Sequence, residues 1–151
     1  MNYPKKLDDI ITLMEGLPEI ERREALVAYA DQAKKQEPRE GEVFDLEDIR
    51  KDEECTDSVG VFLKVDEEGG CHFRIKLGPQ VQTLTRAMTS ILCKGLNGLT
   101  IEALQAVPQD FVPKIVGAEL VRIRSHTVYY ILTRMKSAAM VWKKRKINKD
   151  S

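Results

Sequence analysis

The stretch at residues 59–77 limits the fold of this chain more than any other part of the sequence. Apolar residues fill alternate positions on both sides of a central loop: Val59, Val61, Leu63 and Val65, then Cys71, Phe73, Ile75 and Leu77. A period of two is typical of strands with one buried and one wet face. The loop between them, residues 66–70 (DEEGG), ends in a glycine pair that permits the positive φ values common in tight turns. The stretch therefore predicts an antiparallel β-hairpin.

Helical patterns stand on both sides of this hairpin. Apolar residues recur at helical intervals over residues 3–16 and 80–94, and again over residues 124–142. A further helix is expected from Pro18, with a buried face made of Ile20, Ala25, Leu26, Tyr29 and Ala33. Helices, then strands, then helices indicate an α+β fold, in which a small antiparallel sheet of about three strands packs against N- and C-terminal helices.

Length and composition indicate a single domain. The chain has 151 residues, 42% of them hydrophobic, which is enough for one core and too little for two full domains. We expect four parts: N-terminal helices (1–40), the cysteine turn and hairpin (41–78), a helical part (79–143) and a basic tail (144–151). The sequence leaves open whether the protein is a monomer or a homodimer.

Charge and hydropathy argue against nucleic acid and membranes as partners. Lysine plus arginine and aspartate plus glutamate each number 24, so the formal net charge is zero. No N-terminal stretch has the pattern of a signal peptide, and no apolar run approaches the roughly twenty residues of a membrane span. A cytoplasmic protein is the expectation.

Two of the three cysteines fit a hydrophobic core. Cys71 falls on the apolar face of the hairpin and Cys93 borders an apolar helix stripe, so both are predicted to be small core residues. No CxxC pair is present, and free thiols without a bound metal are the prediction. Convergence of these two cysteines with Cys55 on a structural metal is the alternative.

Cys55 differs because no apolar pattern explains it. Glu53, Glu54 and Asp57 surround it, within an acidic segment (residues 45–57) of seven acids and two bases. Neighbouring carboxylates disfavour the thiolate, which is the nucleophilic form. Such a thiol suits a carrier that is activated only when a partner docks over it. We expect the three acidic neighbours to form part of the docking surface.

With these features in view, the sequence resembles the SufE family of sulfur-acceptor proteins over about residues 19–139. The resemblance rests on ECTDSV at the cysteine turn, on the PQDF segment, and on LVRIRSHTVYYILTRMKSAA, which contains an arginine at the start of the last helix. It implies a SufE/IscU-like fold and a protein that is not itself an enzyme. Members accept sulfane sulfur as a cysteine persulfide from a SufS-like desulfurase, whose pyridoxal phosphate belongs to that partner, stimulate it, and deliver the sulfur to iron–sulfur scaffolds.

The resemblance also implies roles for individual residues. Cys55 matches the acceptor cysteine, and Arg86 (LTRAM) and Arg124 (IRSHT) match basic residues of the family. A guanidinium close to a persulfide stabilises its anion, as arginine does for a thiolate. Two departures are Gly60-Val61, where the family often has a tryptophan, and Thr127, where it usually has a glycine.

Other classes of protein stay open at this point. An IscU-like scaffold for an iron–sulfur cluster or zinc is suggested by Cys55-Thr56-Asp57, but Gly78-Pro79-Gln80 stands where a scaffold has its second cysteine. A nucleophile–histidine–acid triad needs His72 or His126 to reach Cys55. A non-catalytic protein-interaction module is the third alternative.

Overall fold

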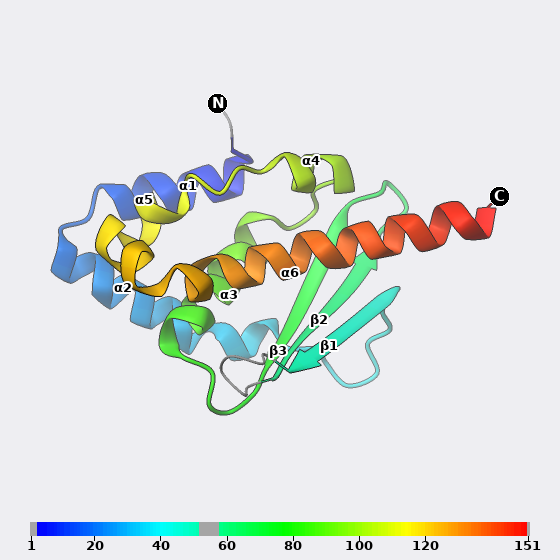
Figure 1. Cartoon of the computed structure of the whole chain (residues 1–151), viewed down its shortest axis with the longest axis horizontal. Coiled ribbons are helices and arrows are strands. Elements are labelled where there is room, and N and C mark those ends of the chain that lie inside the picture. Colours follow the sequence, from blue (N-terminus) through cyan, green and yellow to red (C-terminus); the bar gives the residue numbers. More distant parts are fainter. Residues whose placement is uncertain (1–2, 52–57, 151) are drawn as a thin grey trace.

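The computed structural model describes residues 3–51 and 58–150, in which helices gather around a small sheet (Figure 1). The elements in chain order are α1 (Lys5–Glu15), α2 (Glu19–Asp31), the 3₁₀ turn η1 (Ala33–Gln36), β1 (Leu46–Lys51), β2 (Ser58–Val65), β3 (Cys71–Leu77), α3 (Thr83–Gly95), α4 (Ile101–Ala106), α5 (Val112–Val116) and α6 (Ala118–Asp150). The predicted α+β class is confirmed.

The sheet has three antiparallel strands in the order β1-β2-β3. Strands β2 and β3 form the predicted hairpin, with Val59 opposite Leu77 and Val65 opposite Cys71. Strand β1 pairs with the other edge of β2, from Leu46 opposite Leu63 to Lys51 opposite Ser58. Leu46–Lys51, for which the sequence shows no alternating pattern, therefore forms the third strand of the expected sheet.

The hairpin loop depends on its glycines for two different reasons. Gly69 has a φ of 86°, which only glycine adopts without strain. Gly70 has no room for a side chain, because a Cβ there would lie 2.8 Å from both the Asp66 carboxylate and the Gly98 carbonyl. Asp66 closes the loop by accepting hydrogen bonds from the backbone N–H groups of Glu68 and Gly70.

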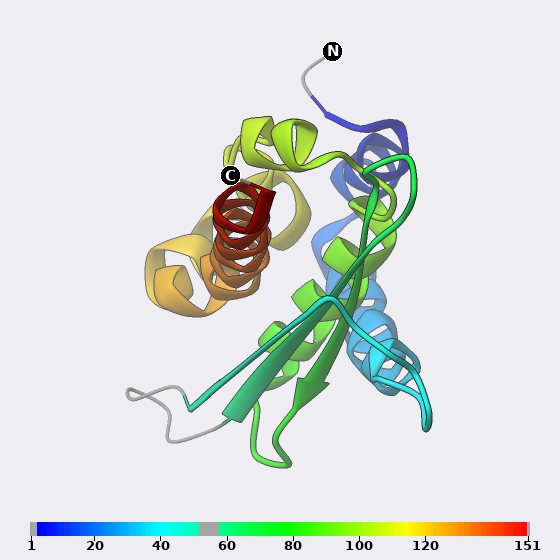
Figure 2. The ribbon, with the colours of Figure 1, turned by 90° about the vertical axis from the view of Figure 1, so that its right-hand side faces the viewer.

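The core lies between the inner face of the sheet and the helices. α6 packs on β1 and β2, while α3 packs on β3 and on α6 (Figure 2). The sheet, α3 and α6 each contribute fully buried side chains to this region. They are Val61, Leu63 and Ile75 of the sheet, Met88, Ile91 and Leu92 of α3, and Val128, Ile131, Leu132 and Met135 of α6. The alternation therefore predicts the buried face of β3 correctly. In β2 it holds for Val59, Val61 and Leu63, but Val65 is only partly buried and Phe62 on the opposite face is also buried.

The buried face predicted for the second helix is partly wrong. α2 follows Pro18 as expected. Leu26 is buried as predicted, and Ala33 is buried in η1 just after the helix. However, Ile20 is 73% exposed, and Ala30, which was not predicted, is buried. An apolar residue in the first turn of this helix therefore contributes nothing to the core.

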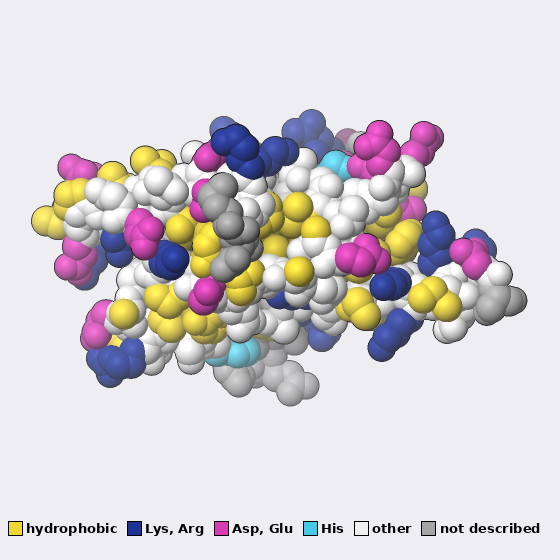
Figure 3. All heavy atoms as spheres, turned by 90° about the horizontal axis from the view of Figure 1, so that it is seen from above, with side chains coloured by type: hydrophobic (Ala, Val, Ile, Leu, Met, Phe, Trp, Pro, Cys, Tyr) yellow, Lys and Arg dark blue, Asp and Glu magenta, His cyan; other side chains and the backbone are white. Residues whose placement is uncertain are grey.

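The last helix is longer than predicted. It begins at Ala118, is kinked at Arg124 and continues through Asp150, so the basic residues after 143 are helical rather than a tail. Figure 1 shows this end of α6 projecting beyond the sheet, and Figure 3 shows lysine and arginine side chains gathered on it. None of the helices within residues 3–51 and 58–150 has the length and apolar character to cross a membrane.

Glu42 anchors the segment that leads into β1. Its carboxylate accepts hydrogen bonds from Lys64 Nζ at 2.8 Å and from the backbone N–H of Arg39 at 3.0 Å, and it pairs with Arg74 Nε at 3.3 Å. The hydrogen bond from Lys64 is the main reason that the pKa of Glu42 falls from 4.5 to about 2. The folded state therefore favours the charged form of this carboxyl.

This anchor predicts a pH-dependent contribution to stability. Because its pKa is lower in the folded state, Glu42 stabilises the fold above pH 4.5, and the contribution is lost as the pH falls toward about 2. A Glu42→Gln variant should be less stable than the wild type near pH ~7, and the difference should shrink by pH ~3. Urea unfolding at both pH values measures this. An equal difference at the two pH values would contradict the linkage.

Candidate functional site

The candidate site is at the end of the sheet where β1 finishes and β2 begins. Lys51 and Ser58 are paired there, and the chain between them contains Cys55. Cys55 and the predicted docking residues Glu53, Glu54 and Asp57 lie outside the described residues. The geometry of the site is therefore given by the elements that border this connection.

Arg86 of α3 donates hydrogen bonds to the loop that follows β3, next to the start of β2. Its Nη2 donates to the Gly78 carbonyl at 3.0 Å and its Nε to the Val81 carbonyl at 3.1 Å. The backbone N–H of Gly78 in turn donates to the Ser58 carbonyl at 2.9 Å. The predicted site residue Arg86 is thus connected through the backbone of Gly78 to Ser58, three positions after Cys55. Among the described residues, its Nη1 has no hydrogen-bond partner.

Arg124 lies on a different element that reaches toward the same end of the sheet. α6 runs opposite in direction to β1. Arg134 pairs with Asp48, whereas Tyr130, earlier in α6, lies near Arg50, later in β1, and helps to raise its pKa. Arg124 is a further six residues toward the start of α6, roughly 9 Å along a helix axis. It is exposed, at the kink, with φ −124° and ψ 38°. Figure 1 shows this part of α6 extending past the strand ends. No contact within the described chain joins Arg124 to Arg86.

Arg134 is a buried arginine that neither the apolar pattern nor the family resemblance predicts as a site residue. It is 2% exposed, and its Nη2 donates to the carbonyls of Asp48 at 2.8 Å and of Val59 at 3.0 Å. Its Nη1 donates to the Tyr130 hydroxyl at 3.0 Å. One side chain of α6 therefore holds β1 and β2 together close to the connection that carries Cys55. Its one signal in the sequence is a charge inside the apolar run ILTRM.

The acidic segment is less free to dock than its charge count indicates. Burial by itself would raise the pKa of Asp48, but the hydrogen bond from Arg50 and the charge of Arg134 lower it overall. Asp48 pairs with Arg50 at 2.7 Å and with Arg134 at 3.6 Å. Asp45 accepts a hydrogen bond from the backbone N–H of Val65 at 2.7 Å. Both carboxylates therefore already have partners within the fold, which makes them less available to a docking protein.

Cys71 and Cys93 are core residues, as predicted. Cys71 is 0% exposed and Cys93 is 6% exposed. Burial raises the pKa of Cys71 to about 11 and that of Cys93 to about 12. Neither thiol forms the reactive thiolate to any extent near neutral pH. Within the described part of the chain, no three His, Cys, Asp or Glu side chains are grouped so as to hold a metal ion.

These burials predict protection of two thiols from alkylation. In the folded protein near pH ~8, Cys71 and Cys93 should react with iodoacetamide at least about a hundredfold more slowly than a free thiol, because both access and thiolate fraction are low. Peptide mapping after timed alkylation measures each site separately. Full labelling in urea is the control. Rapid native labelling of either residue would contradict the described packing.

The fold and the elements that border the candidate site define a small α+β protein with a cysteine in the connection between two antiparallel strands. The chain belongs to the SufE family, whose model is described as an Fe-S metabolism associated domain and matches residues 8–139. The match contains Cys55, Arg86 and Arg124, so the resemblance noted in the sequence is confirmed and the protein takes part in Fe–S metabolism.

Solved structures share the fold. A hypothetical protein from Thermus thermophilus aligns with a TM-score of 0.69 at 23% identity, covering 94% of this chain and 98% of that one. The N-terminal part of a nitrogen-fixing NifU-like protein from Brucella abortus aligns with a TM-score of 0.58 at 15% identity, covering 80% of this chain and 92% of that one. No curated protein matches the sequence.

Proposed function

We propose that this protein is a sulfur acceptor, which takes persulfide sulfur from a SufS-like cysteine desulfurase onto Cys55, stimulates that enzyme and passes the sulfur to iron–sulfur cluster assembly. Membership of the SufE family supports the general role. The NifU-like protein among the structural neighbours agrees with it at the level of the fold. The protein itself catalyses no bond cleavage in cysteine, and the pyridoxal phosphate remains with the partner.

The observation that carries the proposal is the burial of the other two thiols. Cys71 and Cys93 are enclosed in the core, with pKa values of about 11 and 12. A persulfide exchange requires a thiolate that another protein can reach. By elimination, Cys55 is the cysteine left for this chemistry, and it is also the one that matches the family's acceptor.

The proposed transfer is a thiol–disulfide type exchange. The Cys55 thiol loses its proton, and the thiolate attacks the outer sulfur of the desulfurase persulfide. The S–S bond of the partner breaks as the new S–S bond forms on Cys55. The partner's cysteine leaves as a thiolate and takes up a proton, so no external oxidant or reductant is needed. The desulfurase is then free for another turnover.

Arg86 and Arg124 are proposed to favour the anionic forms in this exchange. Each guanidinium carries a permanent charge, and an adjacent cation stabilises a thiolate or persulfide anion. Arg86 has carbonyl partners for Nε and Nη2, which fix its position beside the start of β2. Arg124 is exposed on α6 and is available to a docked partner.

The direct functional test is desulfurase turnover. Adding this protein to a SufS-like desulfurase with cysteine and a thiol reductant should raise the rate of sulfide release, and the rate should saturate with the amount added. Saturation is expected because stimulation requires a stoichiometric complex. A rate that stays at the level of the desulfurase alone would overturn the proposal.

Acidic residues beside Cys55 are expected to contribute to docking. Reversing both Glu53 and Glu54 to lysine should weaken binding to the desulfurase about tenfold or more at low salt, and the loss should diminish as salt screens the charges. Titration calorimetry at two ionic strengths measures this. A matched control is the double reversal of Glu67 and Glu68 in the hairpin loop at the other end of the sheet. Equal affinity of the Glu53/Glu54 variant at low salt would refute the docking surface.

A further inference from the structure

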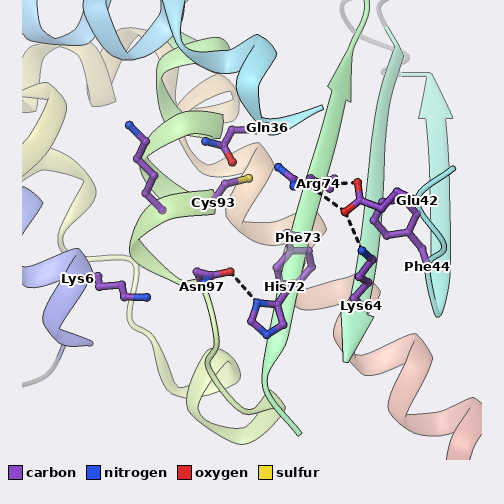
Figure 4. A pocket seen from close by; sticks show the side chains of 11 residues that line it. Lys6, Gln36, Glu42, Phe44, Lys64, His72, Phe73, Arg74, Cys93 and Asn97 are labelled. Atoms are coloured by element: carbon purple, nitrogen blue, oxygen red, sulfur yellow. Dashed lines mark hydrogen bonds and ion pairs between the residues drawn. The ribbon is translucent and has the colours of Figure 1, made fainter. Parts of the chain in front are cut away.

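A cavity lies toward the opposite end of the sheet from the β1–β2 connection. It has a volume of about 490 Å³ and is situated between β3 and the C-terminal half of α3 (Figure 4). Among the described residues, four cationic side chains line it, from Lys6, Lys64, Arg74 and Lys94, against the one carboxylate of Glu42. The lining therefore carries a net charge of +3 in a chain whose formal net charge is zero. A cavity with one dominant sign of charge attracts counter-ions.

Arg74 is the fixed cation of this cavity. Its side chain is only 24% exposed, its Nε pairs with Glu42, and its Nη1 donates to the Lys35 carbonyl at 3.2 Å. Nη2 has no hydrogen-bond partner among the described residues. Figure 4 shows the guanidinium pointing toward Gln36 and Cys93 across the cavity. An arginine held in this way loses little further conformational freedom when it binds an anion.

Neutral donors converge on the same space. The carboxamides of Gln36 and Asn97 line it, and Asn97 is oriented by its contact with His72 Nδ1 at 2.9 Å. Phe73 adds a backbone donor. Since the Asp66–Gly70 and Ser58–Gly78 pairs are hydrogen-bonded, the alternation of the antiparallel ladder turns the Phe73 N–H away from β2, toward the free edge of β3.

The open edge of β3 is too short to bind an extended peptide. At one end Cys71 already exchanges hydrogen bonds with Leu99 and Gly98, both at 2.7 Å. At the other end η1 comes against the strand, where Arg74 donates to Lys35. A stable added strand needs about five residues of edge. The geometry therefore suits a small ligand.

We propose that this cavity binds a small, multiply charged oxyanion. Arg74 Nη2 and the Lys6 amine provide the charge, and Figure 4 shows the Lys6 amine directed toward the Asn97 side of the cavity. Asn97, Gln36 and the Phe73 N–H provide neutral donors. Charge-assisted hydrogen bonds from a guanidinium and an ammonium are the strongest that proteins make to phosphate and carboxylate groups. The site is independent of Cys55 and of sulfur transfer.

Pyrophosphate and citrate are suitable probes, because they distinguish a phosphate from a carboxylate ligand. In the full-length protein at low ionic strength, we expect either probe to shift the NMR signals of the Phe73 amide and the Asn97 carboxamide in a saturable way. Arg74→Gln should weaken this binding about tenfold or more, and Lys6→Ala several-fold. Lys6 is exposed and lies outside the core, so the second variant keeps the test valid if the first unfolds.

Arg145→Gln is the matched control, since it removes the same charge from the exposed end of α6. It should leave the affinity unchanged. The proposal is overturned if neither probe shifts these signals, if Lys6→Ala binds as well as the wild type, or if Arg145→Gln weakens binding as much as Lys6→Ala does, because the last result indicates a general charge effect. None of these outcomes depends on desulfurase activity.

Discussion

A Cys55→Ser variant should abolish stimulation of the desulfurase, so that sulfide release falls to the rate of the desulfurase alone. A serine hydroxyl is not ionised near neutral pH and forms no persulfide, so the acceptor step has no substitute on this chain. The exchange of one sulfur for one oxygen leaves the docking residues in place. We therefore expect the variant to bind the desulfurase with unchanged affinity and to act as a competitive inhibitor of the wild-type protein.

A Cys93→Ala variant is the control for this experiment. It also removes one thiol, but from the core, and its expected effect is a lower melting temperature with stimulation retained. Steady-state sulfide release with each purified variant, together with calorimetry of the complexes, separates the two effects. Stimulation by Cys55→Ser that equals the wild-type level would show that another group accepts the sulfur.

An Arg134→Ala variant should lose about 3 kcal/mol of stability. The substitution leaves the carbonyls of Asp48 and Val59 without the guanidinium that joins them to α6, and it removes one of the two cations that compensate the Asp48 carboxylate. Since this side chain is 2% exposed, water does not replace the lost donors without opening the packing of α6 on the sheet. The urea midpoint measures the loss.

Arg122→Ala provides the matched control on the same helix. Arg122 is paired with Glu119, but their side chains are 70% and 71% exposed, and such a pair contributes little. We expect a change within about 0.5 kcal/mol. If the two alanine variants proved equally stable, the contacts of Arg134 with Asp48 and Val59 would not be what holds α6 on the sheet.

The hairpin could be predicted because its information is local. Val59 to Val65 and Cys71 to Leu77 alternate with a period of two that only Phe62 interrupts, and the glycines mark the loop. Strand β1 has no such pattern, since its two apolar residues, Leu46 and Ile49, point to opposite faces and are 5% and 64% exposed. Pairing with β2 makes it a strand, and that tertiary contact leaves no trace in local periodicity.

The site was only partly accessible from the sequence, for a similar reason. The resemblance to the family predicts roles for Cys55, Arg86 and Arg124, but it gives no indication of Arg134. Its partners in the sheet are 75 and 86 residues away along the chain, so only the folded structure brings them together. The carbonyl contacts of Arg86 are local in sequence, yet they depend on how the loop after β3 is folded against Ser58.

Intact-mass and peptide-mass analysis after incubation with a SufS-like desulfurase and cysteine is the most direct test of the account. We predict a gain of one sulfur atom on the wild-type protein, located on the peptide that contains Cys55, and no gain on Cys55→Ser. Sulfur found on Cys71 or Cys93, or an unchanged mass of the wild-type protein, would contradict the assignment of Cys55 as the acceptor.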